Sequence, residues 1–586
     1  MSAPDLSDEQ SAALDQGVAL LEACPGSGKT RTVVQRFKSR ASTASKGIAL
    51  LSFTNAAVDE ATSRCSDQPR LLKSPNFVGT FDSFIHRYIV TPVLVPSLGK
   101  APTYLESWSS LSISTTLHAW QHPGSGIDLS SFQHDERGRI FLDADFLSRT
   151  ERNYFNGLGT DRARQQLEKQ GISMIEGLTR KGVFDCDSAR ARALAILRGD
   201  QGPAVLSRLS CRFQEVIVDE FQDCSGIEHE IIRLLTSAGI HALVVADADQ
   251  AIYEFRGATV ALYDQYRSSI AEQSRRVLIE NYRSTPAICT LLSSVRAGRQ
   301  TVVSAGSFTS PFPAHVFLLV GAPADVGPRF CAMADEWMIG SKERIALAHS
   351  ATDAQKLGSG IAVSPRGVAL TTRMLLNLGI LRQKKTPSER RKAVIRLETT
   401  ILSLLAWPDA LADQDNLTKL AYLGLESRWL RLVIGRLMRE SDDWTDSASC
   451  KSSLVSILEQ ELGSLGVGFG KSTLKQKMNQ VRPDAWNFWS ESRSAQVDKS
   501  TLQWSTIHGA KGNEYDAVLL DIPSKKAEAA WLADEASEEK RVFYVGASRA
   551  RRLLAIATPK SRLKEFKATL DRFGIKYEAL IVTATR

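Results

Sequence analysis

The chain has 586 residues, which is too many for one hydrophobic core and indicates about three or four domains. Hydrophobic residues make up 43% and charged residues 24% of the chain, which excludes a disordered tail, a collagen-like fibre and a coiled-coil rod. The net charge of +8 is compatible with a polyanionic partner, but it does not separate a nucleic-acid binder from any other basic enzyme.

The ends and the cysteines exclude further classes. Because no run of about eighteen apolar residues occurs, no membrane span is expected. Residues 1–5 are polar and acidic, unlike a signal peptide. The eight cysteines are scattered without a CxxC pair, which disfavours zinc and iron–sulfur sites, and free thiols favour a cytoplasmic location.

The first motif in chain order is a glycine-rich loop between a strand and a helix. An apolar strand is predicted at 18–23, the loop reads ACPGSGKT over 23–30, and a helix follows to about residue 40. This is the P-loop pattern, with Ala23 where its first glycine usually stands. Lys29 would reach the β and γ phosphates, and the Thr30 hydroxyl would hold Mg²⁺. The alternative is a glycine-rich turn that binds nothing, which the intact GKT disfavours.

Two acids follow an apolar strand further along the chain, in the run EVIVDE at 215–220. We expect Asp219 to hold Mg²⁺ through water and Glu220 to orient and deprotonate an attacking water. A polar loop is the alternative for two such acids. The P-loop upstream favours the catalytic interpretation.

Further motifs continue in a fixed order. They are LSDEQ at 6–10, LSFTN at 51–55, GTFDSF at 79–84, VDEFQD at 218–223, ADADQAIYEFRGA at 246–258, NYRST at 281–285, TIHGAKGNEY at 506–515 and RVFYVGASRAR at 541–551. With these motifs the sequence resembles the UvrD/Rep-like superfamily 1 helicases. Asp82 stands where that family usually has His, Phe255 replaces Trp and Ser548 replaces Thr. The resemblance implies an α/β fold of two RecA-like P-loop motor domains, each with a mainly helical insertion, and ATP with Mg²⁺ between them.

The resemblance also implies roles at the nucleotide. The implied catalytic residues are Lys29, Glu220, Gln250, Arg283 and Arg549. The implied nucleotide-binding residues are Gln10, Ala23, Cys24, Pro25, Gly26, Ser27, Gly28, Lys29, Thr30, Arg31, Arg36, Tyr282, Arg283, Glu514 and Arg549, and the metal ligands are Thr30 and Asp219.

Within this set, Arg283 and Arg549 are expected to act as arginine fingers from the second domain, because a guanidinium fork matches phosphate oxygens. A surface salt bridge is the alternative for each. Tyr282 and Arg36 are expected on the two faces of adenine. Gln10 would read the base, and Glu514 would touch the ribose.

Ten residues are implied to contact DNA. They are Phe53, Thr54, Asn55, Thr80, Phe81, Tyr253, Phe255, Arg256, Thr506 and His508. Among them Phe53, Tyr253 and Phe255 are candidate base-stacking platforms, which contribute about 1–3 kcal/mol per base irrespective of sequence. Packing in the core is the alternative for aromatic residues.

Apolar runs predict the buried strands of parallel sheets. They lie at 48–53, 216–218, 242–246, 316–320, 345–348, 517–520 and 553–557. The predicted units are a first RecA-like domain (1–88 and 212–277), a helical insertion in it (89–211), a second RecA-like domain (278–355 and 498–586) and a reduced accessory insertion (356–497). A basic cluster at 382–396 would grip duplex DNA, or it forms a solvated helix face or a protein-partner surface.

The leading functional interpretation is an ATP-dependent translocase and helicase. By resemblance it moves 3′→5′ on single-stranded DNA and acts on tailed or forked duplexes, in DNA repair or in anti-phage defence. The short chain is also similar to the helicase subunit of Gabija-type systems, which works with a nuclease subunit. The alternative is a DNA-end-sensing ATPase subunit that regulates a partner nuclease with little unwinding. The two arginine motifs disfavour an ordinary P-loop kinase or GTPase.

Overall fold

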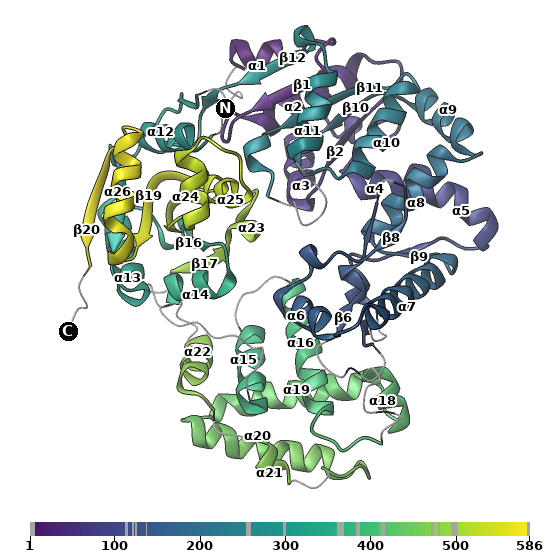
Figure 1. Cartoon of the computed structure of the whole chain (residues 1–586), viewed down its shortest axis with the longest axis vertical. Coiled ribbons are helices and arrows are strands. Elements are labelled where there is room, and N and C mark those ends of the chain that lie inside the picture. The colour runs from purple at the N-terminus through teal and green to yellow at the C-terminus, as the bar shows by residue number, and fades with distance from the viewer. Residues whose placement is uncertain are drawn as a thin grey trace.

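The structure, a computed structural model, describes residues 6–111, 115–119, 122, 126–135, 137–252, 260–296, 301–359, 369–382, 387–408, 411, 416–469, 473–478, 481–493 and 502–582. Within these residues the chain forms two parallel six-stranded sheets, each covered by helices on both faces, and two smaller units (Figure 1). The predicted α/β class with parallel sheets is confirmed.

The first domain is built on the sheet nearest the N-terminus. Its strands, in spatial order, are β12 (Arg275–Leu278), β1 (Leu20–Ala23), β11 (His241–Ala246), β10 (Phe213–Val218), β2 (Gly47–Ser52) and β3 (Phe77–Thr80). Successive residues of a strand point to opposite faces, so Leu50 packs on one side and Leu51 on the other. One face is covered by α2 (Lys29–Thr43) and α3 (Asn55–Arg64), the other by α4 (Phe81–Ile85), α8 (Cys186–Arg198), α9 (Gly202–Arg212), α10 (Gly226–Ser237) and α11 (Val260–Ser269).

The second domain has the same architecture. Its strands, in spatial order, are β17 (Gln503–Thr506), β16 (Arg344–Ala348), β18 (Tyr515–Asp521), β19 (Ala550–Thr558), β15 (Val316–Val320) and β20 (Tyr577–Ile581). One face carries α12 (Pro286–Val295), α23 (Ile507–Ala510), α24 (Lys525–Leu532), α25 (Glu538–Ala547) and α26 (Leu563–Arg572), and the other carries α13 (Pro323–Glu336) and α14 (Ala351–Ser359).

The insertion in the first domain is smaller than predicted. Its own core lies between residues 108 and 178 and is enclosed by α6 (Arg149–Gly157), α7 (Asp161–Arg180) and two short hairpins, β5 (Thr116–Leu117) with β6 (Ile127–Asp128) and β7 (Gln133–His134) with β8 (Ile140–Phe141). Residues 89–94 and 184–209, which the sequence placed in the insertion, pack instead in the core of the first domain. The apolar face of α8 covers the first sheet, which explains the difference.

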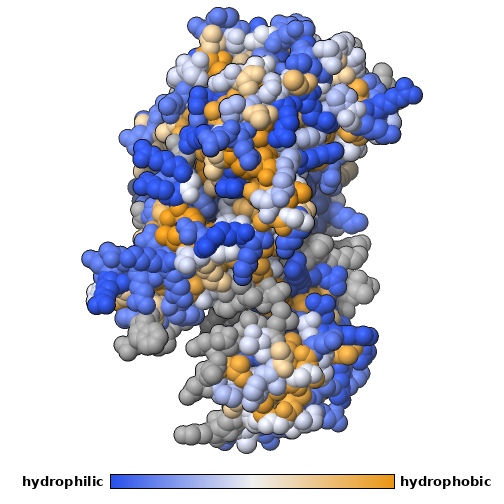
Figure 2. Space-filling view, turned by 90° about the vertical axis from the view of Figure 1, so that its right-hand side faces the viewer, coloured by the Kyte–Doolittle hydropathy of each residue, from blue (hydrophilic) through white to orange (hydrophobic). Residues whose placement is uncertain are grey.

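The accessory unit is an all-helical bundle with a single core. Its helices are α15 (Leu370–Arg382), α16 (Pro387–Leu402), α18 (Asn416–Tyr422), α19 (Ser427–Glu440), α20 (Ser447–Leu462), α21 (Leu474–Lys477) and α22 (Pro483–Arg493). Figure 1 shows it at the opposite end of the molecule from the first sheet. Figure 2 shows hydrophobic side chains at its surface, and its exposed apolar residues include Ile395, Tyr422 and Leu432.

The basic cluster at 382–396 is divided in this unit. Arg382 pairs with Asp442 at 2.5 Å and donates to the carbonyl oxygen of Met438, so its guanidinium is engaged within the accessory unit. Arg390 and Arg391 are exposed on α16, and Lys384 and Lys385 lie outside the described residues. In the described part of the chain, no helix has the length and hydropathy needed to cross a bilayer.

Candidate nucleotide and DNA site

A cavity of about 930 Å³ lies between the two domains. On the first domain it begins at the carboxyl ends of β1, β2 and β10, the edge at which parallel α/β sheets bind ligands. On the second domain it is lined by residues of three predicted motifs, which are Tyr282, Arg283, Glu514 and Arg549.

The P-loop supplies an anion site in this cavity. Gly26 and Gly28 have φ angles of 70° and 77°, a left-handed conformation that glycine adopts without strain. Lys29 begins α2, and its buried ammonium group has no hydrogen-bond partner in the structure. A buried, unpaired cation at a helix N-terminus favours an anionic ligand, and the residues therefore fit the phosphates of ATP.

The second domain lies directly against this loop. The backbone N–H of Tyr282 donates to the carbonyl oxygen of Gly26 at 2.9 Å. A Cβ atom added at Gly26 would approach Asn281 Oδ1 and Arg283 Cβ to 2.6 Å each. The approach of the two domains therefore requires glycine at position 26.

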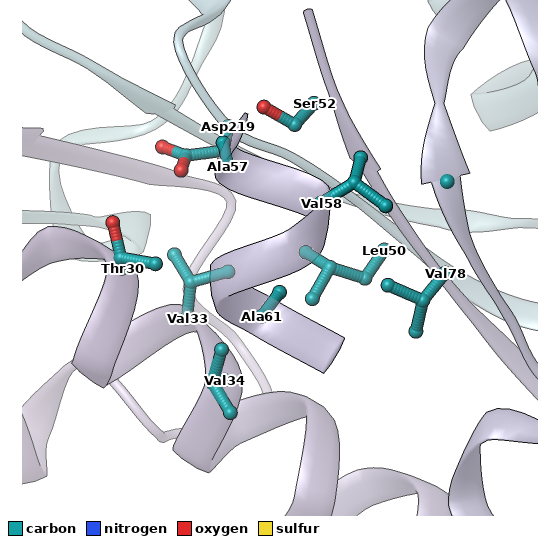
Figure 3. A pocket seen from close by; sticks show the side chains of 11 residues that line it. Thr30, Val33, Val34, Leu50, Ser52, Ala57, Val58, Ala61, Val78 and Asp219 are labelled. Atoms are coloured by element: carbon teal, nitrogen blue, oxygen red, sulfur yellow. The ribbon is translucent and has the colours of Figure 1, made fainter. Parts of the chain in front are cut away.

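The predicted metal ligands face one space. Thr30 and Asp219 both line the cavity, and Figure 3 shows them at the same edge of a smaller pocket whose other lining side chains are mainly apolar. Burial and the neighbouring Glu220 raise the pKa of Asp219, and the charge of Lys29 offsets only part of this effect. Two oxygen ligands fit Mg²⁺, which keeps several waters and phosphate oxygens. Among the described residues, no group of three or more His, Cys, Asp or Glu side chains suits another metal.

Glu220 has a strained backbone at this site. Its φ of 55° and ψ of 39° lie in the left-handed region, which costs about 1–3 kcal/mol for a residue other than glycine. The Gln222 amide donates to its carboxylate. Burial raises the pKa of Glu220, but the charges of Lys29, Lys511 and Arg549 and the hydrogen bond from Gln222 together outweigh burial and hold this pKa below its usual range. Glu220 therefore remains a carboxylate that can accept a proton.

Two arginines form the facing wall. Arg549 is buried, and its Nη2 donates to Oε1 of Gln250 at 3.0 Å. Burial, together with the charge of Arg283, lowers the pKa of Arg549 to about 10. Arg283 donates to the carbonyl oxygen of Ser548 at 3.0 Å and to the carboxylate of Glu514. Two guanidinium groups confined in one cavity favour binding of a polyanion.

Three consecutive carbonyl groups of the first domain are held by the second domain. Lys511 donates to the carbonyl oxygen of Gln250 at 2.9 Å, and Arg541 donates to that of Ala251 at 2.7 Å. Nε2 of His508 lies 3.0 Å from the carbonyl oxygen of Ile252. His508, predicted to contact DNA, is thus engaged at the interface between the domains.

Arg36, predicted to stack on adenine, is buried in the first domain. It pairs with Glu215 at 2.7 Å, and both side chains are at most 1% exposed. Its guanidinium also donates to the carbonyl oxygens of Ala13 and Asp15. The prediction for Arg36 is therefore wrong. Arg31, also on α2, lines the cavity instead.

Other predicted nucleotide residues are divided between the cavity and the core. Tyr282 is 41% exposed and lines the cavity. The Gln10 amide donates to the carbonyl oxygen of Ser27 at 2.9 Å, so it contacts the P-loop, and its contact with adenine remains a prediction. The cavity is lined by Pro25, Gly26, Gly28, Lys29, Thr30 and Arg31, whereas Ala23, Cys24 and Ser27 are buried.

The first DNA motif presents one aromatic ring. Phe53 lines the cavity and is stacked on Phe81, with ring centroids 5.8 Å apart and an angle of 11° between the planes. Phe81 is 1% exposed and lies in the core. The prediction that Phe81 contacts DNA is therefore wrong, because this ring is buried and packs against Phe53.

The three threonines predicted to contact DNA are helix N-caps in the described chain. Thr54, Thr80 and Thr506 each begin a helix, and each hydroxyl accepts a backbone N–H of its first turn. Asn55 is exposed as the first residue of α3. Tyr253, Phe255 and Arg256 lie outside the described residues.

Asp82 replaces the usual histidine and has a different partner. Arg190 of α8 donates to both of its carboxylate oxygens, at 2.7 and 2.9 Å. Arg190 also lies 3.1 Å from Glu228. Asp82 therefore links α4 to α8 through a partly buried ion pair, and Arg190 extends the link to Glu228 of α10.

Sequence reasoning missed several residues of the cavity wall, and four of these form one segment. It consists of Ser307, Phe308, Thr309 and Ser310. The segment lies between β14 (Val303–Ser304) and β15 and carries no motif, so it reads as an ordinary loop. Only the tertiary structure brings it beside Tyr282, whose carbonyl oxygen and the Phe308 ring both lie close to Gly306.

Comparison with protein families agrees with this geometry. Residues 6–271 match the UvrD/REP helicase N-terminal domain, and residues 470–561 match the UvrD-like helicase C-terminal domain. The chain belongs to the UvrD-like helicases. The predicted family, and with it the prediction of an enzyme from a family of ATP-dependent DNA helicases, is confirmed.

Individual UvrD-like relatives are distant. The chain is 21% identical to a probable DNA helicase II homolog of Mycoplasma pneumoniae, over 94% of this chain and 83% of that relative. It is 27% identical to DNA helicase II of Escherichia coli over 46% of this chain, and 24% identical to the ATP-dependent DNA helicase PcrA of Staphylococcus aureus over 50% of it. These two matches cover 37% and 40% of the relatives, less than half of their length.

Proposed function

We propose that the chain is an ATP-driven translocase on single-stranded DNA that unwinds duplex DNA. One observation carries the proposal. The unpaired ammonium of Lys29 lies in a cavity that Arg283 and Arg549 line from the other domain. A triphosphate bound there would contact both domains and would draw them together, which is how a motor converts hydrolysis into movement.

Each residue has a step in this mechanism. Lys29 would bind the β and γ phosphates, and Glu220 would orient the attacking water and accept its proton. Mg²⁺ held by Thr30 and Asp219 would neutralise phosphate charge. Arg283 and Arg549 would stabilise the charge that develops on the γ-phosphate.

The same interface would pass this change to DNA. Lys511, Arg541 and His508 hold the carbonyl groups of residues 250–252. The chain continues directly into 253–256, the predicted DNA motif. Closure at the phosphates would therefore move residues 250–252 relative to Phe53.

Polarity and pathway belong to the proposal as well. The resemblance supports 3′→5′ movement, and either repair or anti-phage defence with a nuclease partner fits the residues. Strand displacement tests the activity and its polarity. We expect ATP-dependent unwinding of a duplex with a 3′ tail and none with a 5′ tail, and no unwinding by Lys29→Ala.

Two other outcomes would change the conclusion. DNA-stimulated ATP hydrolysis without displacement on either duplex would support the DNA-end-sensing alternative. Unwinding of only the 5′-tailed duplex would reverse the polarity and leave the motor assignment intact. Phage plating efficiency, compared with survival after ultraviolet damage in a deletion strain, separates defence from repair.

A further inference from the structure

Five charged side chains alternate in sign along the second-domain wall of the cavity. They are Arg283, Glu514, Arg551, Asp516 and Arg552, and all five line the cavity. We call them the charge ladder. Two of its links run through Arg551, which donates to Glu514 Oε2 from Nε at 3.1 Å and from Nη2 at 3.0 Å, and which lies 3.6 Å from Asp516.

Glu514 divides its carboxylate between two arginines. Oε1 accepts from Arg283 and Oε2 accepts from Arg551. Burial raises the pKa of Glu514, but these two guanidinium groups outweigh burial and hold that pKa below its usual range. The carboxylate is therefore charged, and it acts on both arginines at once.

Arg283 is held back by this contact. Its Nη2 is engaged by Glu514 and its Nη1 by the carbonyl oxygen of Ser548, while its buried Nε has no partner in the structure. Because Arg283 is hydrogen-bonded to Glu514, movement of its guanidinium toward a phosphate would weaken this contact. If Arg551 were absent, the Glu514 carboxylate would then remain unpaired beside a polyanion, which is electrostatically unfavourable.

We propose that Arg551 is a positioning residue for Arg283. It shares Glu514 while Arg283 is at rest, and it compensates the carboxylate once Arg283 moves to the γ-phosphate. Arg551 is the last residue of the motif at 541–551, and the resemblance assigns it no role. A guanidinium suits the task because its fork contacts Glu514 and Asp516 together. The inference rests on the proposed function.

The test is a comparison of ATPase kinetics with saturating single-stranded DNA. Arg551→Ala is expected to lower kcat about tenfold while KM for ATP changes less, because coupled charges interact at this scale. Arg551→Lys should recover part of kcat. Adding Glu514→Gln to Arg551→Ala should recover most of it, since the charge that retains Arg283 is gone. Arg572→Ala, which removes an exposed arginine of the same domain, is the control for lost charge.

Two outcomes would overturn the inference. They are an unchanged kcat in Arg551→Ala, or a double variant whose kcat falls below that of Arg551→Ala instead of recovering. Because the Arg551 side chain is 42% exposed, we expect Arg551→Ala to fold. Arg551→Gln serves if it does not, with the same expected loss and recovery. An unmutated chain without ATPase activity would instead contradict the proposed function itself.

Discussion

Gln250 and Arg549 join the two domains at the nucleotide cavity, where Nη2 of Arg549 donates to Oε1 of Gln250 at 3.0 Å. The other end of the amide is fixed, because Nε2 of Gln250 donates to Asp247 at 2.9 Å. Gln250 thus connects a buried acid of the first domain to a cation of the second. A γ-phosphate that attracts Arg549 would act on this connection directly.

We expect Arg549→Ala to lower the turnover of ATP by about a thousandfold or more, the range for arginine fingers, and to change nucleotide affinity much less. Turnover should fall more than affinity because the guanidinium acts on charge that develops only in the transition state. Single-turnover kinetics and binding of a fluorescent nucleotide measure the two quantities. Normal turnover would show that Arg549 is no finger.

Lys29→Ala is expected to abolish ATP hydrolysis and to leave binding of single-stranded DNA intact. The buried ammonium is the cation nearest the start of α2, whereas the DNA platform Phe53 follows another strand. Hydrolysis and fluorescence anisotropy with a labelled oligonucleotide measure the two effects. Lys38→Ala, which changes a lysine on the same helix that pairs with Asp67, is the matched control. Near-normal hydrolysis in Lys29→Ala would refute the P-loop assignment.

Glu215→Gln is expected to destabilise the first domain by about 3–5 kcal/mol, because it leaves the buried Arg36 charge uncompensated. Thermal and urea unfolding measure the loss. Asp67→Asn, at an exposed pair, should change stability little. At a permissive temperature KM for ATP should stay normal in Glu215→Gln and should rise in Arg31→Ala. The reverse pattern would restore Arg36 as a nucleotide residue.

Phe308→Ala is expected to raise KM for ATP about two- to tenfold, since an aromatic contact contributes about 0.5–1.5 kcal/mol beyond buried area. Its ring lines the cavity near Tyr282. Phe312 packs on Phe308 with centroids 4.9 Å apart and is not among the cavity residues, so Phe312→Ala should have a smaller effect. Equal effects would indicate that the loop only needs packing.

Substitution of the two stacked phenylalanines should have different effects, one on DNA binding and the other on the stability of the first domain. Phe53→Ala is expected to weaken binding of single-stranded DNA by about 1–3 kcal/mol, the range for one stacked base. Phe81→Ala should lower the free energy of unfolding by about 3–5 kcal/mol, because it empties a buried site. Anisotropy and urea unfolding measure the two. Unchanged DNA affinity in Phe53→Ala would remove it from the DNA surface.

Apolar runs in the sequence predicted the interior strands of both six-stranded sheets but not their edge strands. In the two six-stranded sheets, the strands that apolar runs did not predict are β12, β3, β17 and β20, and each lies at the edge of its sheet. An edge strand is partly solvated, so its residues need not be apolar. In β17 the pattern QWST shows this directly, with an exposed first residue and three half-buried ones.

The sequence likewise predicted some features of the site and not others. Motifs predicted Lys29, Asp219, Glu220, Arg283 and Arg549, and all five line the cavity. Motifs did not predict orientation. Arg31 and Arg36 are five residues apart on α2, which places them about 140° apart around the helix, and only Arg31 faces the cavity. The partners of Arg551 depend on tertiary packing and have no signal in sequence order.

The hydrogen bonds from the second domain to the carbonyl groups of residues 250–252 have a consequence for sequence evolution. The contacts are made to main-chain oxygens, which every amino acid carries. Substitution of Ala251 therefore removes no partner of Arg541. Related sequences should keep the side chains at 508, 511 and 541, whereas positions 251 and 252 should vary independently of them. Covariation between the two groups of positions should therefore be weak although their atoms are in contact.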